Sequence, residues 1–141
     1  MNRKFLFLCA FSMLVLLFSC KKKETSMEMN MNFAKIDFSK RVHDFGTINE
    51  GDKVKTSFSF TNTSDTDLII TQVYGSCGCT VPEYPREPVK TGEKKNINIS
   101  FDSHGKSGVQ DMSITIISNT YSGIENLGIK AIVTPKSGVA Q

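Results

Sequence analysis

The chain has 141 residues, with 17 Lys and Arg against 14 Asp and Glu, and a formal net charge of +3. A chain this close to neutrality lacks the basic patch or stripe with which proteins bind nucleic acid, so we predict no nucleic-acid partner. Hydrophobic residues make up 39% of the sequence, which is enough for one core, and the length allows one domain of ordinary size.

Residues 1–19 are predicted to be a signal peptide. The basic residues Arg3 and Lys4 precede the segment 5–18, which is apolar apart from Ser12. Its length matches the apolar part of a signal peptide and falls short of the roughly 20 residues needed to span a bilayer. An ordinary secretory peptide or a short helix is the alternative.

Cys20 directly follows this apolar run and the small residue Ser19, a pattern that resembles the lipobox of bacterial lipoproteins. The resemblance implies cleavage before Cys20, a diacylglycerol thioether on its sulfur and a third acyl chain on its new amine. Two acyl chains of about 30 methylenes in total supply more than ~20 kcal/mol of membrane affinity. Because Lys-Lys-Lys-Glu follows Cys20, in place of the acidic residues that direct some lipoproteins to the cell surface, we expect an outer-membrane anchor facing the periplasm.

Residues 20–35 are predicted to be the lipidated cysteine and a flexible tether, because they show neither strand nor helix periodicity. Met27, Met29 and Met31 lie within five residues of this segment. Thioethers at alternate positions can converge on Cu(I), a soft ion, so copper binding is one hypothesis. A polar tether that happens to contain methionine is the other.

Residues 36–134 alternate between apolar and polar side chains, the pattern of half-buried β-strands, and turn clusters separate the alternating segments. We therefore predict an all-β domain, an Ig-like antiparallel β-sandwich of about seven strands, followed by a flexible tail at residues 135–141. The expected strands are 36–45, 53–60, 67–74, 96–101, 112–116 and 127–133, with a short seventh near Val89.

Several motifs along this domain resemble one bacterial family. They are HDFGTI at 43–48, FSFTN at 58–62, SCGCTVP at 76–82 and ISFD at 99–102. Their combination over residues 40–133 resembles the family called domain of unknown function 1573, which is similar in turn to Ig-like domains of the major-sperm-protein and hydin type. The resemblance implies an envelope-located Ig-like sandwich, often lipid-anchored, and it supplies no activity.

Cys77 and Cys79 are the candidate site, because Cys9 is lost with the signal peptide and Cys20 carries the lipid. Three interpretations stay open. A disulfide suits an oxidising compartment, and the glycine between the two cysteines permits the necessary bend. Two thiolates can instead hold a soft metal such as copper, for which His104 and the tether methionines are the obvious further donors. The third interpretation is a pair of small packed residues with no chemical use.

We predict no catalytic residues. His43 and His104 are the only histidines, and the sequence contains neither the Gly-x-Ser-x-Gly elbow of a serine hydrolase nor a phosphate-binding glycine loop. The preferred hypothesis is a non-enzymatic module, held at the membrane by its lipid, that binds an envelope protein through an edge strand or loop end. The alternative is a periplasmic copper-binding or thiol-redox protein that uses Cys77 and Cys79.

Overall fold

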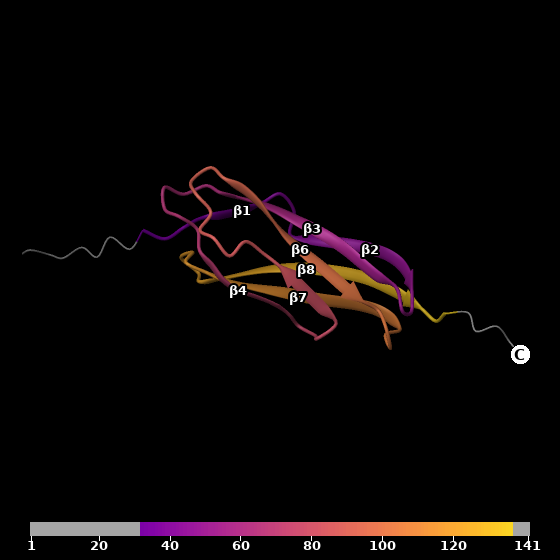
Figure 1. The fold of residues 1–141 in the computed structure, drawn as a ribbon. Helices are drawn as coiled ribbons and strands as arrows, with labels where there is room; N and C mark the ends of the chain where they lie inside the picture. Colours follow the sequence, from indigo (N-terminus) through magenta and orange to yellow (C-terminus); the bar gives the residue numbers. More distant parts are fainter. Residues whose placement is uncertain (1–31, 137–141) are drawn as a thin grey trace, which may run out of the picture. The chain divides into compact units, whose positions relative to one another are not determined.

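The computed structural model describes residues 32–136 and arranges them as two four-stranded β-sheets packed face to face (Figure 1). The first sheet has the strand order β1-β3-β6-β5 and the second β2-β8-β7-β4. The strands are β1 (Ile36–Phe38), β2 (Val42–Asn49), β3 (Lys53–Asn62), β4 (Ile70–Gly75), β5 (Thr80–Glu83), β6 (Lys94–Asp102), β7 (Gly108–Ser118) and β8 (Ile124–Thr134).

The predicted all-β, Ig-like sandwich is confirmed. Residues 32–136 contain no helix with the length and apolar character of a membrane span. The predicted signal peptide and the lipidation site Cys20 lie outside the described residues, as do Met27, Met29 and Met31.

The four long central strands are β3, β6, β7 and β8. Because side chains alternate along a strand, every second side chain of these strands points into the space between the sheets. Burying a large aliphatic or aromatic side chain stabilises a fold by about 1.5–3 kcal/mol, so this layer is the main source of stability. Its buried residues are Phe58, Phe60, Ile97, Ile99, Phe101, Met112, Ile114, Ile116, Leu127, Ile129, Ala131 and Val133.

Residues 36–45, expected to be one strand, form parts of two. β1 pairs antiparallel with β3 in the first sheet, whereas β2 pairs in parallel with β8 in the second. At the crossing, the Ser39 N–H donates to the Ser59 carbonyl at 3.0 Å, and the Arg41 carbonyl accepts from the Gly128 N–H at 2.8 Å. The prediction of an entirely antiparallel sandwich is therefore wrong at this edge, where one segment of chain joins both sheets.

Two predictions near the middle of the chain are also corrected. Val89 forms an isolated bridge with Leu68 and not a strand. Residues 80–83, expected to be loop, form β5, which pairs antiparallel with β6. The segment is only four residues long and contains Pro82, a residue that strands tolerate mainly at an edge, so its alternation is too brief to recognise.

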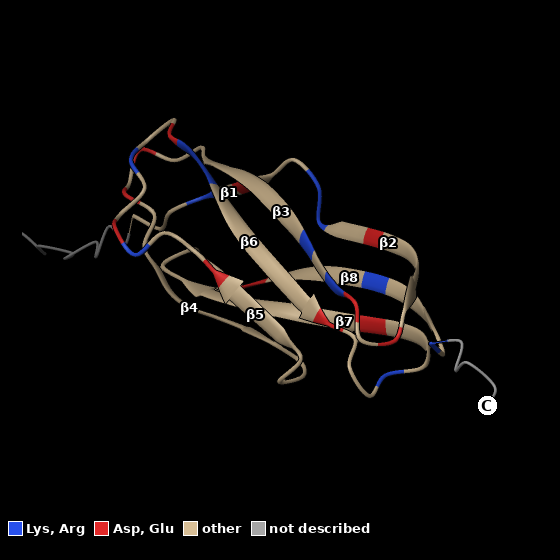
Figure 2. Cartoon of the chain, turned by 45° about the vertical axis from the view of Figure 1, so that its right-hand side comes forward, with Lys and Arg blue, Asp and Glu red and all other residues tan. Residues whose placement is uncertain are grey.

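A row of charged side chains crosses the outer face of the second sheet. Asp44 on β2, Lys130 on β8 and Asp111 on β7 occupy paired positions, and Figure 2 shows a red, a blue and a red band on these three neighbouring strands. The Lys130 Nζ lies 3.3 Å from an Asp111 carboxylate oxygen. An exposed ion pair of this kind contributes little stability, but opposite charges on neighbouring strands favour this strand register.

Candidate functional site at the Cys77–Cys79 loop

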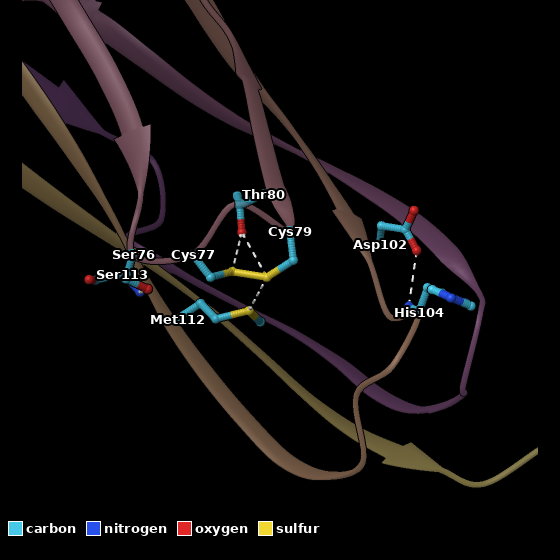
Figure 3. The surroundings of a disulfide bond; sticks show 8 residues. All are labelled: Ser76, Cys77, Cys79, Thr80, Asp102, His104, Met112 and Ser113. Carbon is cyan, nitrogen blue, oxygen red and sulfur yellow. Dashed lines mark hydrogen bonds between the residues drawn. A yellow bond between two sulfur atoms is a disulfide. The ribbon is translucent and has the colours of Figure 1, made fainter.

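The candidate cysteines lie on the loop that leaves β4 in the second sheet and enters β5 in the first. A disulfide joins Cys77 to Cys79, whose Cα atoms are 5.2 Å apart (Figure 3). The Thr80 N–H donates to the Cys77 carbonyl at 3.3 Å and closes the turn around the intervening glycine. Of the three interpretations that the sequence left open, the structure contains the disulfide; any functional use of the pair stays a prediction.

Hydrogen bonds fix this loop to both sheets. The Ser76 N–H donates to the Ser113 carbonyl on β7 at 2.8 Å, and the Ser113 N–H donates to the Ser76 Oγ at 3.2 Å. On the other side, the Asp102 N–H on β6 donates to the Cys79 carbonyl at 3.0 Å. The disulfide therefore sits where the two sheets are joined, in a backbone held on either side.

Thr80 brings a hydroxyl to both sulfur atoms. Its Oγ1 lies 3.5 Å from the Cys77 Sγ and 4.0 Å from the Cys79 Sγ, and because a disulfide sulfur carries no hydrogen, the hydroxyl is the donor. The approach depends on Gly75: a Cβ added there would lie 2.7 Å from the Thr80 Cβ. The glycine at the end of β4 therefore lets the buried threonine pack beneath the disulfide.

Met112 supplies a third sulfur. Its Sδ lies 3.9 Å from the Cys79 Sγ, and Figure 3 shows the thioether directed at the disulfide from β7. The side chain is only 6% exposed. The sequence places Met112 in the expected strand 112–116. Alternation along that strand shows that Met112 points inward, but it does not show which loop the side chain contacts. The one sequence feature that sets this position apart is a flexible methionine in line with the inward isoleucines of β7.

The outer face of the first sheet is hollowed beside Cys79. A depression of about 280 Å³ is lined there by Lys53, Lys55, Cys79, Val81, Ser100, Phe101 and Asp102. A second depression of about 380 Å³ adjoins it and shares Lys55 and Ser100 with the first. Between them they form a shallow trough along β6 that reaches the disulfide.

Asp102 places a carboxylate at the rim of this trough. The backbone N–H of His104 donates to its carboxylate, and the Lys53 Nζ lies 3.1 Å from the same group. The His104 N–H, followed by Lys53, holds the pKa of the Asp102 carboxyl below its ordinary value. The carboxylate neutralises part of the lysine charge, whereas Lys55 has no comparable acid among its in-register neighbours, Ser100 and Val81.

The two histidines are held elsewhere. The His104 Nδ1 lies 3.4 Å from a Glu50 carboxylate oxygen, and Figure 3 shows its ring pointing away from the sulfur atoms. His104 and the cysteine pair are thus not brought together as copper ligands, because the loop after β6 turns the imidazole outward. In residues 32–136 there is no group of three or more His, Cys, Asp or Glu placed to hold a metal ion.

His43 packs against an aromatic ring and accepts a hydrogen bond from a lysine. Its ring packs edge-on against Phe45, with ring centroids 4.5 Å apart, and its Nδ1 accepts a hydrogen bond from the Lys40 Nζ at 3.1 Å. Partial burial, and then the charge of Lys40, lower the pKa of His43. The neutral imidazole is therefore favoured in the folded domain.

The two four-stranded sheets packed face to face define an Ig-like β-sandwich domain. The ASH/PapD-like domain 7 of human CEP192 is similar with a TM-score of 0.56 and 9% identity, over 79% of this chain and 93% of that chain. The secreted serine protease VesC from Vibrio cholerae is similar with a TM-score of 0.55 and 11% identity, over 70% of this chain and 23% of that chain. At such identities the likeness shows the fold alone.

The chain belongs to the family described as protein of unknown function (DUF1573), whose profile matches residues 36–133, and the resemblance seen in the sequence motifs is confirmed. A protein of unknown function from Porphyromonas gingivalis W83 has a TM-score of 0.64 and 16% identity, over 77% of this chain and 51% of that chain. No curated protein matches the sequence. This chain spans about half or less of the length of the Porphyromonas gingivalis and VesC chains to which it is similar.

Proposed function

We propose that this chain is a lipid-anchored protein of the bacterial cell envelope whose Ig-like domain binds a protein partner and catalyses no reaction. The apolar segment at residues 5–18 and the lipobox-like position of Cys20, both read from the sequence, support the proposed anchor. The observation that carries the binding role is the trough on the outer face of the first sheet, with Val81 exposed in it.

The trough arises from the side chains that face outward in register. Lys55, Ser100 and Val81 form one row across β3, β6 and β5. The small side chain on β6 stands between two larger ones, which leaves a hollow with an aliphatic wall and a basic wall. Val81 is 59% exposed, so a partner that covers it removes apolar surface from water, as the central residues of protein interfaces do.

Contacts at the strand edges weigh against docking by strand addition. On β4 the Tyr84 hydroxyl donates to the Thr71 carbonyl at 3.3 Å, so that carbonyl is already engaged. On β2 the Asp44 carboxylate accepts from the Gly46 N–H at 2.7 Å, next to an irregularity in the β2–β8 pairing. Charged residues and irregular pairing are means by which proteins discourage edge-to-edge association. Both edges of the second sheet are thus poorly suited to strand addition, and we prefer the face of the first sheet to those edges as the docking surface.

Site-specific photo-crosslinking in cells producing the full chain tests the binding role. A photoreactive residue replaces Val81 in one variant and Val109 in the matched control, which is a 78% exposed valine on the other sheet. We expect a discrete crosslinked product from position 81 and none from position 109. No product from position 81, or the same products from both positions, would overturn the assignment.

Intact mass of the mature protein tests the anchor separately. We expect a chain that begins at Cys20 and carries the mass of three acyl chains, and a Cys20→Ala variant that keeps its leader. A wild-type protein with residues 1–19 still attached would exclude lipid anchoring, whatever the crosslinking shows.

A further inference from the structure

We propose that Cys77, Cys79 and Met112 form a binding site for one Cu(I) ion that is closed while the disulfide is intact and opens when it is reduced. The site goes beyond the proposed binding role and requires neither the lipid anchor nor a protein partner. It also differs from the copper hypothesis drawn from the sequence, because its third donor is a buried methionine of β7, and neither His104 nor the tether contributes.

The spacing of the sulfur atoms suits a three-coordinate metal. With metal–sulfur bonds of about 2.3 Å, as in a metal thiolate, three sulfurs in one plane around an ion lie about 4 Å apart. The Met112 Sδ already lies 3.9 Å from the Cys79 Sγ. Reduction frees the Cys77 sulfur to complete the triangle, and the intervening glycine, with no atom within 4 Å of a Cβ placed on it, leaves the turn room to adjust.

The ligand chemistry favours copper in its lower oxidation state. Two thiolates and a thioether are soft donors, which select Cu(I) over hard cations. Met112 is 6% exposed and adaptable in conformation, so the ion would be bound at the boundary of the core, away from bulk water. Residues 32–136 contain no further cysteine or methionine, and the His104 ring points away from the sulfur atoms (Figure 3), so the part of the chain that the structure describes does not supply the four ligands of a structural zinc site.

The surroundings also favour the thiolate form that a metal needs. The Thr80 hydroxyl is within 3.5 Å of the Cys77 sulfur and can donate to a thiolate there. Lys53 and Lys55 line the depression beside Cys79, and neighbouring positive charge stabilises a thiolate. The same depression gives a reductant or a copper donor access to Cys79 from the outer face of the sheet.

The opening step requires a dithiol donor. A donor thiolate bonds to the Cys79 Sγ and the sulfur–sulfur bond to Cys77 breaks, so Cys77 leaves as a thiolate. The donor's second thiolate then displaces Cys79 and forms the donor's own disulfide. Two electrons pass to the cysteine pair, and the donor dithiol is oxidised. Binding of Cu(I) afterwards displaces any protons held by the two thiols.

Anaerobic titration of the full mature chain with Cu(I), against a competing chromophoric chelator, tests the site. We expect one tightly bound ion after reduction with dithiothreitol and removal of that reductant, and none in the oxidised protein. Cys77→Ser/Cys79→Ser should abolish binding. Met112→Leu, a substitution that keeps side-chain volume, should weaken it about tenfold to a hundredfold, the cost that changes around a metal site typically bring.

A triple variant, Met27→Leu/Met29→Leu/Met31→Leu, is the matched control and should bind as tightly as the wild type. X-ray absorption should count three sulfur ligands on copper in the wild type and two in Met112→Leu. Equal affinity in Met112→Leu and wild type, equal binding by oxidised and reduced protein, or loss of binding in the triple variant would overturn the proposal. If Met112→Leu does not fold, a wild-type ligand count other than three sulfurs would overturn it.

Discussion

The two ends of β4 are secured by different chemistry. Before β4 begins, the fully buried Asn62 at the end of β3 donates from its Nδ2 to the carbonyls of Thr66 at 2.8 Å and Val89 at 2.9 Å. Its Oδ1 accepts from the N–H and hydroxyl of Ser64. After β4 ends, the Cys77–Cys79 loop is closed by a covalent bond that spans only one intervening residue.

The comparison separates a residue needed for folding from one available for chemistry. Removal of Asn62 deletes four hydrogen bonds made by one fully buried side chain, which is costly. Removal of the disulfide releases little chain entropy, because so short a ring restricts the unfolded chain only slightly. We infer that the asparagine is present for stability, whereas stability alone is a weak reason for the cysteine pair. Three predictions test this contrast, and a fourth tests the pH dependence that His43 confers.

The largest effect is expected at the asparagine. Asn62→Ala should lower the free energy of unfolding by about 3 kcal/mol, because four hydrogen bonds and the packing of a fully buried side chain are lost together. Urea denaturation measures the change. Asn98→Ala, on the exposed face of β6, is the control and should change stability by less than about 0.5 kcal/mol. A similar decrease in the free energy of unfolding in both variants would show that the hydrogen bonds of Asn62 do not stabilise the fold more than an exposed asparagine does.

A smaller loss is expected at the junction beneath the disulfide. Gly75→Ala should destabilise the domain by about 1–3 kcal/mol, since the new methyl group meets the Thr80 Cβ at 2.7 Å and that carbon is fixed to the backbone. Gly78→Ala has open space and should cost less than about 1 kcal/mol. Thermal unfolding of the two variants gives the comparison, and equal melting temperatures would contradict the packing described.

The disulfide itself should contribute less than Asn62. Cys77→Ser/Cys79→Ser is expected to lower the free energy of unfolding by less than about 2 kcal/mol, the limit that loop entropy sets for so short a ring. Urea denaturation of oxidised wild type, reduced wild type and the double variant measures it. A loss as large as that of Asn62→Ala would make the disulfide a main support of the fold and remove the contrast.

The smallest effect concerns pH. Because the folded domain lowers the pKa of His43, it binds that proton more weakly than the unfolded chain does. The stability that neutral His43 contributes to the folded domain is therefore fully present above about pH 6.5, the ordinary pKa of histidine. This stability is lost as the pH falls through the lowered pKa of His43 in the folded domain. Chemical denaturation between neutral and mildly acidic pH should show a shallower decline in His43→Gln than in wild type. Parallel curves would mean that His43 is not responsible.

The alternation of side chains predicted most of the core but not its pairings. Alternation along the expected strand 53–60 predicts that Phe58 and Phe60 point inward, and both are buried. Asn62, two positions further on the same face, was not singled out, although that spacing predicts a buried amide. Strand periodicity can identify a buried polar residue of this kind, because it shows which positions face inward. A search for hydrophobic residues alone would overlook it.

The candidate site was only half accessible to sequence reasoning. The sequence points to Cys77 and Cys79 because a single residue separates them and the other two cysteines lie in the predicted signal peptide and at the predicted lipidation site. Met112 lies far along the sequence and reaches Cys79 because β7 pairs with β4, a partnership that no local pattern specifies. The division of residues 36–45 between two sheets was missed for the same reason, since alternation reveals which side chains are inward but not which strand lies alongside.

That division has a mechanical consequence. β1 is joined to β3 through three paired positions, whereas β2 lies alongside β8 and runs in the same direction. When residues 32 and 136 are pulled apart, the bridge between Ala34 and Thr120 bears the force first, and β1, which pairs with β3, bears it next. β2 and β8 are then drawn past each other lengthwise, so their hydrogen bonds resist together and not one after another. A domain tethered at its N-terminus would in this way yield slightly under tension before its main sheets come under strain.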